Sequence, residues 1–234
     1  VVGWDTTDPT RDGELLARVQ NSVYALRHLP ELGLLVLGHN FQGIQAIDLS
    51  QKQLVHATAL PPVAIFEIVF SESRQRLYVA LGDGTLAVLT VPDFRLEKLL
   101  RLADKSLRCL ALHEGRSELA VGSSDTFTRI LDLDSLEVKC LLGESTNSVF
   151  SVAYSVDGMR LLTAGRDAQI RTWDVATGYT LTGSVPAHMY TINHLAFSPD
   201  GRYLASCSLD KSIKIWDAAD RTLLRVLDRA RAAG

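Results

Sequence analysis

Residues 208–220 read SLDKSIKIWDAAD, and residues 165–177 read GRDAQIRTWDVAT. Each stretch places an aspartate six residues before a Trp-Asp pair, and the two tryptophans, Trp173 and Trp216, are 43 positions apart. Self-similarity at a fixed step of this size is the sequence signature of a repeat architecture. The shared spacing therefore predicts that the chain contains copies of one unit.

The Trp-Asp position recurs through the whole chain at steps of 42 or 43 residues. In six copies the second position of the pair is occupied by Asp5, Asp48, Thr90, Asp132, Asp174 and Asp217. Another column is leucine in every copy: Leu35, Leu77, Leu119, Leu161 and Leu204. The chain is thus a tandem array of one unit.

Each unit is divided into short apolar runs by turn residues. The last unit contains INHLAFS, RYLASCS, SIKIWDA and TLLRVLD, separated by PDG, LDK and ADR. Runs of this length, rich in Val, Ile and Leu and bounded by Gly, Pro and Asp, indicate strands rather than helices. Four strands in a unit of this period are typical of one blade of a β-propeller, so the expected fold class is all-β.

The composition limits the classes of function. The chain has 234 residues, 47% of them hydrophobic, and a net charge of -3. This charge argues against nucleic-acid or membrane binding. Cys109, Cys140 and Cys207 are odd in number and widely spaced, which fits neither a disulfide framework nor a metal site and favours a reducing, cytoplasmic location.

The repeats resemble WD40 repeats. Residues 188–217, HMYTINHLAFSPDGRYLASCSLDKSIKIWD, match the pattern of that family almost throughout. The resemblance covers essentially the whole chain, is strong in the last two copies and is degenerate in the first two. It implies a β-propeller of four-stranded WD40 blades, from a bacterial-type or general WD40 protein.

The expected organisation is one partial propeller domain, residues 1–234, with five complete blades and an N-terminal half-blade. The predicted half-blade and blades are residues 1–20, 21–62, 63–104, 105–146, 147–188 and 189–234. The resemblance implies truncation from a seven-bladed ring. A complete ring is expected to be monomeric, whereas residues 1–234 alone are expected to aggregate or oligomerise through unpaired strand edges and uncapped blades.

The resemblance also implies a hydrogen-bonded set of four side chains in the last unit. These are His188, Ser206, Asp210 and Trp216. The unit before retains Thr163, Asp167 and Trp173, with Ser145 where the histidine is expected, and the two units before that keep only Asp125 and Asp83. Each bond of this kind contributes on the order of 1 kcal/mol. Units without the set are expected to rely on apolar packing.

The sequence offers little support for a catalytic motif. The His188, Ser206 and Asp210 side chains could suggest a hydrolase triad, but they stand at the structural spacing of the family beside a tryptophan. LGDGTL at residues 81–86 lacks the lysine of a phosphate-binding loop, and the six histidines form no HxxxH or HExxH motif. We therefore expect no catalytic residue, no cofactor and no metal.

The resemblance implies a binding face made by the loops at one end of the blades. Three positions per unit point into it: three and five residues after the histidine column, and one before the turn aspartate. The candidate partner-binding residues are Tyr24, Asn40, Phe66, Arg108, Phe150, Arg166, Thr191 and Asn193. Tyr, Phe and Arg belong to the residue types enriched at protein interfaces.

Three functional hypotheses follow. The first is a non-catalytic scaffold that binds a protein or peptide through this face. The alternative is a propeller enzyme, a hydrolase or a lyase, with its site in the central channel, although the first strands carry mainly apolar residues with isolated His28 and His194. The third is one domain of a larger signalling protein. Fold alone does not decide between them.

Overall fold

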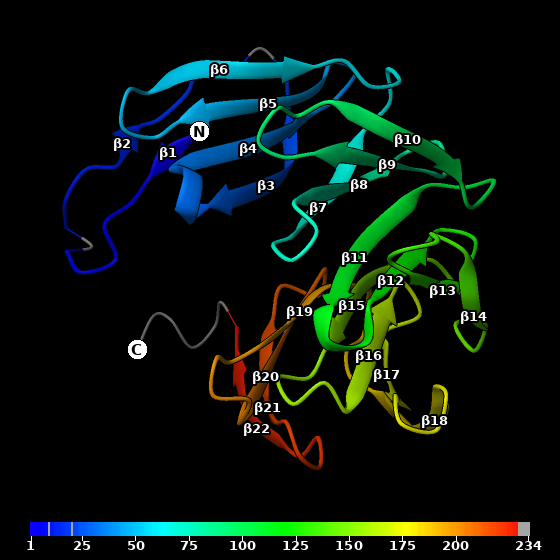
Figure 1. The fold of residues 1–234 in the computed structure, drawn as a ribbon. Coiled ribbons are helices and arrows are strands. Elements are labelled where there is room, and N and C mark those ends of the chain that lie inside the picture. Colours follow the sequence, from blue (N-terminus) through cyan, green and yellow to red (C-terminus); the bar gives the residue numbers. More distant parts are fainter. Residues whose placement is uncertain (9, 20, 229–234) are drawn as a thin grey trace. The chain divides into compact units, whose positions relative to one another are not determined.

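The computed structural model describes residues 1–8, 10–19 and 21–228. The chain divides into two compact units, Val1–Leu102 (unit 1) and Ala103–Gly234 (unit 2), each built from antiparallel strands (Figure 1). Helical structure in the described ranges consists of the single turns η1 (Pro30–Leu32) and η2 (Glu114–Arg116). No helix of these ranges has the length and apolar character that a membrane crossing requires.

Unit 1 contains one pair of strands and two four-stranded sheets. The pair is β1 (Val2–Gly3) with β2 (Glu14–Leu15). The first sheet consists of β3 (Val23–Leu29), β4 (Leu34–His39), β5 (Gly43–Asp48) and β6 (Gln53–Thr58). The second consists of β7 (Ile65–Ser71), β8 (Arg76–Leu81), β9 (Thr85–Thr90) and β10 (Leu96–Arg101).

Unit 2 contains three four-stranded sheets. They are β11 (Leu107–His113), β12 (Glu118–Ser123), β13 (Thr128–Asp132) and β14 (Val138–Leu142); β15 (Val149–Tyr154), β16 (Arg160–Gly165), β17 (Gln169–Asp174) and β18 (Thr180–Pro186); and β19 (Ile192–Phe197), β20 (Tyr203–Ser208), β21 (Ile213–Asp217) and β22 (Leu223–Leu227). In every sheet of both units the strands are joined in sequence order, each antiparallel to the next. The predicted all-β class with four-stranded, blade-like sheets is confirmed.

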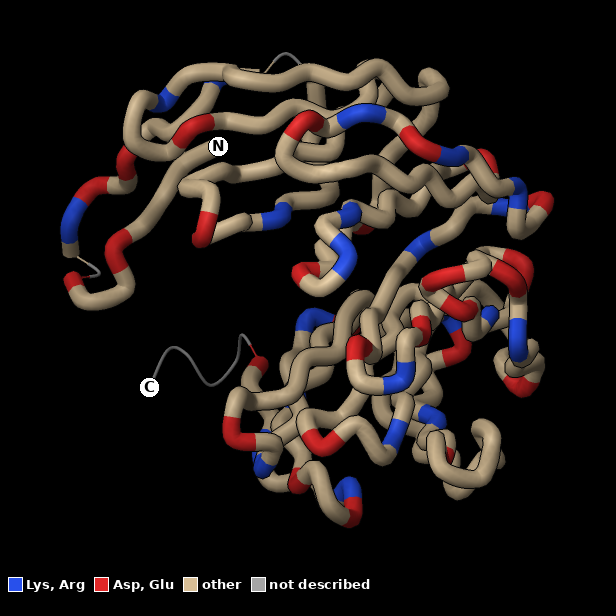
Figure 2. The backbone as a smooth tube through the Cα atoms, in the orientation of Figure 1, with Lys and Arg blue, Asp and Glu red and all other residues tan. Residues whose placement is uncertain are grey.

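The sheets lie within the units expected from the repeat. Each four-stranded sheet falls inside one of the five predicted blade ranges, and the pair β1–β2 falls inside residues 1–20. The two middle strands of the first four four-stranded sheets are largely buried, as β9 shows, whereas β20 and β21 of the last sheet are only partly buried. The last strand of each sheet is largely exposed. Many of the charged residues accordingly lie in turns and outer strands (Figure 2).

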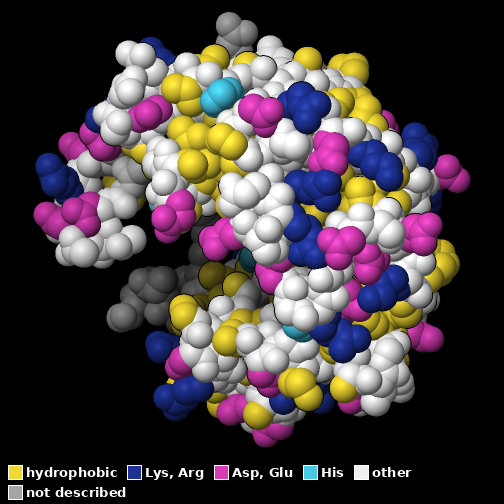
Figure 3. Space-filling model, in the orientation of Figure 1, with side chains coloured by type: hydrophobic (Ala, Val, Ile, Leu, Met, Phe, Trp, Pro, Cys, Tyr) yellow, Lys and Arg dark blue, Asp and Glu magenta, His cyan; other side chains and the backbone are white. Residues whose placement is uncertain are grey.

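The core of each unit lies between adjacent sheets. In unit 1, Val36 and Ala46 of the first sheet belong to the same buried cluster as Leu77, Val79 and Leu89 of the second. In unit 2, Trp173 and Trp216 each enter a cluster with apolar residues of the preceding sheet. On the face drawn in Figure 3, positive and negative side chains are interspersed with hydrophobic ones.

The turn between the second and third strands is shaped by the recurrent aspartate. In four sheets its Oδ1 atom accepts a hydrogen bond from the backbone N–H two residues later. The donor and acceptor residues are Thr85 and Asp83, Phe127 and Asp125, Gln169 and Asp167, and Ser212 and Asp210. This is the local bond for which aspartate is favoured in turns.

The first sheet lacks this aspartate and forms its turn differently. Phe41 stands at the aspartate position, and φ is positive at both Phe41 (70°) and Gly43 (86°). A Cβ atom at Gly43 would lie 2.1 Å from the Thr58 carbonyl oxygen. This turn therefore depends on glycine, in both its backbone conformation and its close approach to the neighbouring chain.

Candidate functional site

The first strand of every four-stranded sheet carries a β-bulge at the same position. The pairing register shifts between Val23 and Ala25, Ile65 and Glu67, Leu107 and Cys109, Val149 and Ser151, and Ile192 and His194. The bulged residues are Tyr24, Phe66, Arg108, Phe150 and Asn193, five of the eight predicted partner-binding residues. A bulge leaves its extra residue out of the ladder and re-aims the side chain.

A second recurrent contact closes the same end of each sheet. The residue before the turn donates its backbone N–H to the carbonyl of the residue two before the bulge. The pairs are Asn40 to Ser22 (3.3 Å), Gly82 to Ala64 (2.8 Å), Ser124 to Ser106 (2.9 Å), Arg166 to Ser148 (2.9 Å) and Leu209 to Thr191 (2.9 Å). All three predicted positions of each unit therefore gather at one end of its sheet, which we call the loop face.

Bulged residues of adjacent sheets contact each other within each unit. In unit 1 the rings of Tyr24 and Phe66 stack with centroids 5.9 Å apart and planes 19° apart. In unit 2 the guanidinium carbon of Arg108 lies 4.6 Å from the centroid of the Phe150 ring. Stacked aromatic and cation–π pairs hold both partners in defined orientations. The predicted residues thus form small ordered groups on the loop face.

The loop face of unit 2 includes two apolar residues that sequence reasoning missed. Met189 and Tyr190 are 84% and 61% exposed, beside Leu209 at 64%. The Met189 N–H donates to Asp210 Oδ2 (3.3 Å), and Ser208 Oγ donates to the Tyr190 carbonyl (3.2 Å). The signal in the sequence was two large apolar residues directly after His188, in a loop position where burial does not require them.

The four side chains predicted to form a hydrogen-bonded set in the last unit are joined in one continuous chain. Trp216 Nε1 donates to Ser206 Oγ at 2.9 Å, and Ser206 Oγ lies 2.7 Å from His188 Nε2. His188 Nδ1 lies 2.9 Å from Asp210 Oδ2. Because an ionised Asp210 can only accept a hydrogen bond, His188 Nδ1–H donates to it; in the neutral imidazole Nε2 then accepts from the Ser206 hydroxyl, whose oxygen accepts from the Trp216 indole N–H.

The same geometry argues against a nucleophilic role for Ser206. Its side chain is fully buried, at 0% exposure, and its oxygen already accepts the Trp216 indole N–H. A catalytic serine needs an oxygen that a substrate carbonyl can reach. The His188–Ser206–Asp210 set therefore supports the sheet and the loop that follows His188.

In two sheets an arginine replaces the missing histidine. Arg171 Nη1 lies 2.8 Å from Asp167 Oδ2 and 3.5 Å from Ser145 Oγ, while Trp173 donates separately to Thr163 Oγ1 at 3.0 Å. The expectation that these units rely on apolar packing is wrong, because their turn aspartates form ion pairs inside the sheet. The signal was an arginine four residues after the aspartate.

The preceding sheet of unit 2, β11–β14, repeats this arrangement. Arg129 donates to Asp125 through both terminal guanidinium nitrogens, Nη2 at 2.6 Å and Nη1 at 3.2 Å. In the second sheet of unit 1 the arginine position is Ala87, which is fully buried together with Val79 and Leu81. The expectation of apolar packing thus describes that sheet and fails for the next two.

A buried carboxylate ties two sheets of unit 2 together at the end opposite the loop face. Glu118, the first residue of β12, is 2% exposed and accepts hydrogen bonds from Tyr179 Oη (2.6 Å), Lys139 Nζ (2.8 Å) and Arg116 Nε (3.1 Å). Tyr154 and Tyr179 hydroxyls are 2.8 Å apart, and burial raises the pKa of both. Burial alone would raise the pKa of Glu118, but these donors lower it, so the carboxylate stays charged.

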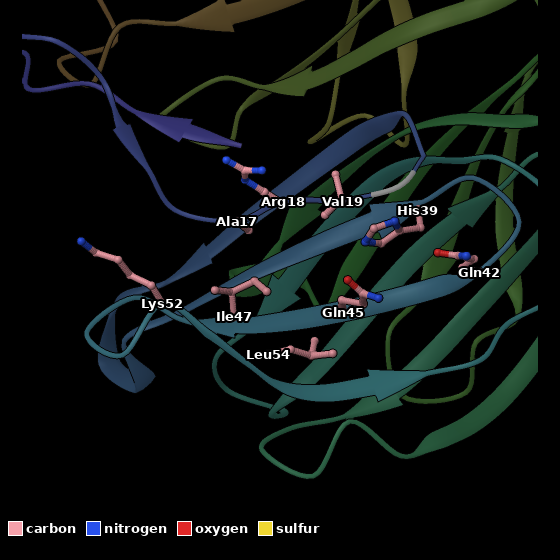
Figure 4. Close-up of a pocket in the computed structure, with 9 residues that line it drawn as sticks. All are labelled: Ala17, Arg18, Val19, His39, Gln42, Gln45, Ile47, Lys52 and Leu54. Carbon is pink, nitrogen blue, oxygen red and sulfur yellow. The ribbon is translucent and has the colours of Figure 1, made fainter.

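Unit 1 contains a cavity of about 460 Å³ beside the segment that follows β2 (Figure 4). His39, Gln45, Ile47 and Leu54 line it from β4, β5 and β6. Among the described residues, neither ring nitrogen of His39 makes a hydrogen bond, and burial lowers the pKa of its imidazole.

The next sheet explains this cavity. Leu81, at the position equivalent to His39, is fully buried in the cluster formed with the adjacent four-stranded sheet. His39 instead faces the segment that belongs with the two-stranded pair β1–β2. The neighbour of His39 has two strands, whereas the neighbour of Leu81 has four, and the cavity lies beside the smaller neighbour. The cavity therefore does not by itself indicate a small-molecule site.

Metal-type residues do not cluster in residues 1–8, 10–19 and 21–228, where no group of three or more His, Cys, Asp and Glu side chains could hold an ion. His28 and His194 are exposed on β3 and β19, in different units. Cys109, Cys140 and Cys207 are not joined in disulfides. Among the described residues, the loop face is therefore the candidate functional site.

The hydrogen bonds of Asp210 make a prediction about acid stability. Burial opposes ionisation, but donors from Ser212 and His188 hold the pKa of Asp210 far below its ordinary value of 3.8. The resulting stabilisation is complete above the unfolded pKa and is lost as pH falls through the lower folded pKa. Asp210→Asn should therefore lower the urea midpoint at pH 7 and make a smaller difference below about pH 4.

The exposed Asp12→Asn variant is the matched control, and its urea midpoint should follow that of the unmodified chain at every pH. An equal loss of stability in the Asp210→Asn variant at all pH values would contradict the assigned role of the carboxylate.

Comparison with known proteins agrees with the repeat pattern. The family model described as "WD domain, G-beta repeat" (WD40) matches residues 136–174 and 179–217. Periodic tryptophan protein 2 of Saccharomyces cerevisiae is 28% identical over 116 residues, which are 49% of this chain and 12% of that protein. WD repeat-containing protein SL1-17 of Schistosoma mansoni is 30% identical over 131 residues, 56% of this chain and 43% of that protein.

A further relative carries a more specific name. Pre-mRNA-processing factor 19 of Bos taurus is 25% identical over 149 residues, 63% of this chain and 29% of that protein. The chain thus spans less than half the length of each of these three relatives.

Proposed function

Because this chain belongs to the WD40-repeat family, we propose that it is a non-catalytic scaffold that binds a protein or peptide partner through its loop face. The supporting observation is the recurrent bulge, which sets Tyr24, Phe66, Arg108, Phe150 and Asn193 outside the strand ladders at the same end of their sheets. The closing backbone bonds hold the flanking positions in place.

Preorganisation is what makes such a face suitable for recognition. Side chains that are already ordered lose less conformational freedom when a partner binds. Tyr, Phe and Arg supply most of the binding energy in many interfaces, because they bury a large area with few rotatable bonds or form directed hydrogen bonds. The stacked Tyr24–Phe66 pair and the Arg108–Phe150 pair have these properties.

The alternative of an enzyme with a site in the central channel receives no specific support. The one constellation that resembles a catalytic triad has its serine buried and its oxygen occupied by Trp216. The cytoplasmic location stays a prediction from cysteine usage.

A triple substitution on the loop face tests the proposed function. Phe66→Ala, Phe150→Ala and Arg166→Ala together should remove most of the proteins captured by the unmodified chain, because two aromatic anchors and an exposed cation are lost. Captured proteins are identified by quantitative mass spectrometry in the context of the full-length protein. The melting temperature should stay within a few degrees, since surface truncations away from the core usually change stability little.

A control variant truncates exposed side chains on outer strands: Leu99→Ala, Leu141→Ala and Arg225→Ala. It should retain the captured proteins. If the loop-face variant captures the same proteins as the unmodified chain, the loop face is not the binding surface. Selective loss in the control variant would instead identify the outer strands as that surface.

A further inference from the structure

Phe41 is a large apolar residue held in a strained backbone conformation on the loop face of unit 1. Its φ of 70° lies in the left-handed region, which is unfavourable for a bulky side chain. The other described residues that combine a left-handed backbone with a large apolar or aromatic side chain are Phe94, Leu136 and Tyr179. They are 1%, 8% and 6% exposed, so core packing offsets their strain, whereas Phe41 is 64% exposed.

The Phe41 side chain thus carries backbone strain without the burial that accompanies it in the other three residues. Backbone strain of this kind persists where the surrounding structure enforces it, and it is often found at binding sites. An exposed aromatic ring in such a turn has its main use in contact with another molecule. We therefore looked for the residues that would make this contact together with Phe41.

Two further aromatic residues lie at the same end of the sheets. The Phe41 backbone N–H donates to the Val63 carbonyl (3.3 Å), and Val63 leads directly into β7 and its bulged residue Phe66. Asn40, the residue before Phe41, is joined by its own N–H to the segment before Tyr24. Tyr24 is 60% exposed, and its ring stacks on that of Phe66. We call Tyr24, Phe41 and Phe66 the aromatic surface.

The loops that carry the aromatic surface are almost uncharged. Residues 21–24, 40–42, 59–66 and 82–84 contain one charged side chain, Asp83, whose Oδ1 accepts the Thr85 N–H. Burial raises the pKa of Glu67, the next residue along β7, to about 7. A partner segment that binds these loops therefore needs apolar contact and neutral hydrogen bonds rather than complementary charge.

A proline-rich segment has this chemistry. In the polyproline II conformation the backbone has no internal hydrogen bonds, so its carbonyl groups are free to accept hydrogen bonds from a partner. Surfaces lined with aromatic side chains bind such segments, which are already extended and lose little conformational freedom. The exposed side chains of Tyr24 and Gln42 supply a hydroxyl and an amide as donors.

We propose that the aromatic surface of unit 1 binds a proline-rich segment of a partner protein in the polyproline II conformation. Proline rings pack on Tyr24 and Phe41, and carbonyl groups of the segment accept hydrogen bonds from Tyr24 and Gln42. The proposal rests on the proposed scaffold function and specifies the class of partner that the scaffold takes.

Selection from a random 12-residue peptide library displayed on phage tests this chemistry in the full-length protein. The unmodified protein should enrich peptides that contain two or more prolines. Phe41→Asn should lose this enrichment, because it removes the exposed ring. The matched control is Gln75→Asn, which also changes an exposed residue with a left-handed backbone (φ 49°) but lies in the β7–β8 turn at the opposite end of its sheet. It should select the same peptides as the unmodified protein.

The stability of the Phe41→Asn variant separates a binding role from a structural one. Asparagine adopts the left-handed conformation more readily than phenylalanine, so the substitution relieves strain and removes little packing. The melting temperature should rise by about 2–4 °C while the proline-rich peptides are lost. A fall in the melting temperature would show that Phe41 supports the fold and would overturn the proposal.

Fluorescence anisotropy of one enriched peptide gives the magnitude. Phe41→Asn and Tyr24→Ala should each weaken its binding about tenfold or more, because each removes an aromatic contact. Tyr24→Phe, which removes only the hydroxyl, should weaken it about three- to tenfold. An increase from about 0.1 M to about 0.5 M salt should change the dissociation constant by less than about twofold, since no ion pair is involved.

The outcomes separate the partner class from the proposed function. Enriched peptides without proline whose binding is lost in Phe150→Ala would overturn the proline-rich class and leave the loop face as a binding surface. Selected peptides that bind all loop-face variants equally, or no enrichment at all, would overturn both. A dimer of the unmodified protein that becomes monomeric in Phe41→Asn would assign the aromatic surface to a second copy of the chain and overturn the proposal.

Discussion

Replacing Arg171 with leucine is expected to lower the free energy of unfolding by about 3–5 kcal/mol, the range seen when one partner of a buried ion pair is removed. Arg171 and Asp167 have side chains that are only 8% and 7% exposed, and their closest nitrogen and oxygen atoms are 2.8 Å apart. The substitution leaves the Asp167 carboxylate in the sheet with its main cationic partner gone. Urea denaturation of the full-length protein at pH 7 measures the loss.

The double variant Asp167→Asn with Arg171→Leu provides the decisive comparison, because asparagine removes the charge and keeps an Oδ1 acceptor for the Gln169 N–H. It should be more stable than Arg171→Leu alone, because removing both charges removes the desolvation penalty of the remaining carboxylate. The exposed pair Arg95–Asp93, with atoms 3.8 Å apart, is the surface control, and Arg95→Gln should cost no more than about 1 kcal/mol. A double variant less stable than Arg171→Leu would contradict the ion-pair assignment.

Replacing Ser206 with alanine is expected to cost about 2–6 kcal/mol, because two buried groups lose their partner and each such loss costs about 1–3 kcal/mol. The two groups are the Trp216 indole N–H, at 2.9 Å from Ser206 Oγ, and His188 Nε2, at 2.7 Å. The change removes a single oxygen atom and leaves little room for a packing effect. The urea midpoint again measures the loss.

The neighbouring sheet supplies the matched control for this prediction. Thr163→Val keeps the side-chain volume and removes one hydrogen bond, the one from Trp173 Nε1 at 3.0 Å. It should therefore cost less than Ser206→Ala, because Thr163 bonds to Trp173 without a histidine on its other side. Equal losses in the two variants would show that the His188–Asp210 part of the chain contributes no stability.

The repeat period and the short apolar runs bounded by turn residues were enough to predict the strands and the turns, which depend on a few adjacent residues. The Trp216–Ser206–His188 connection was implied by the resemblance to WD40 repeats. The bulge positions also coincide with predicted residues such as Phe66 and Phe150, but only the pairing register reveals why those side chains leave the ladder.

Only the tertiary structure decided which side chains of different elements contact each other. The role of Arg171 was not predicted, because a sequence does not tell whether two residues four apart across a tight turn face each other. In the structure Arg171 and Asp167 pair at 2.8 Å. The exposed Met189 and Tyr190 were missed because their burial depends on what packs over the loop.

The contact of Arg108 with Phe150 joins residues 42 positions apart. Its geometry depends on how two sheets pack, and the local pattern of neither sheet contains that information. The sequence by itself thus determined the elements and their order, whereas side-chain packing between those elements determined which charges are paired and which remain available on the loop face.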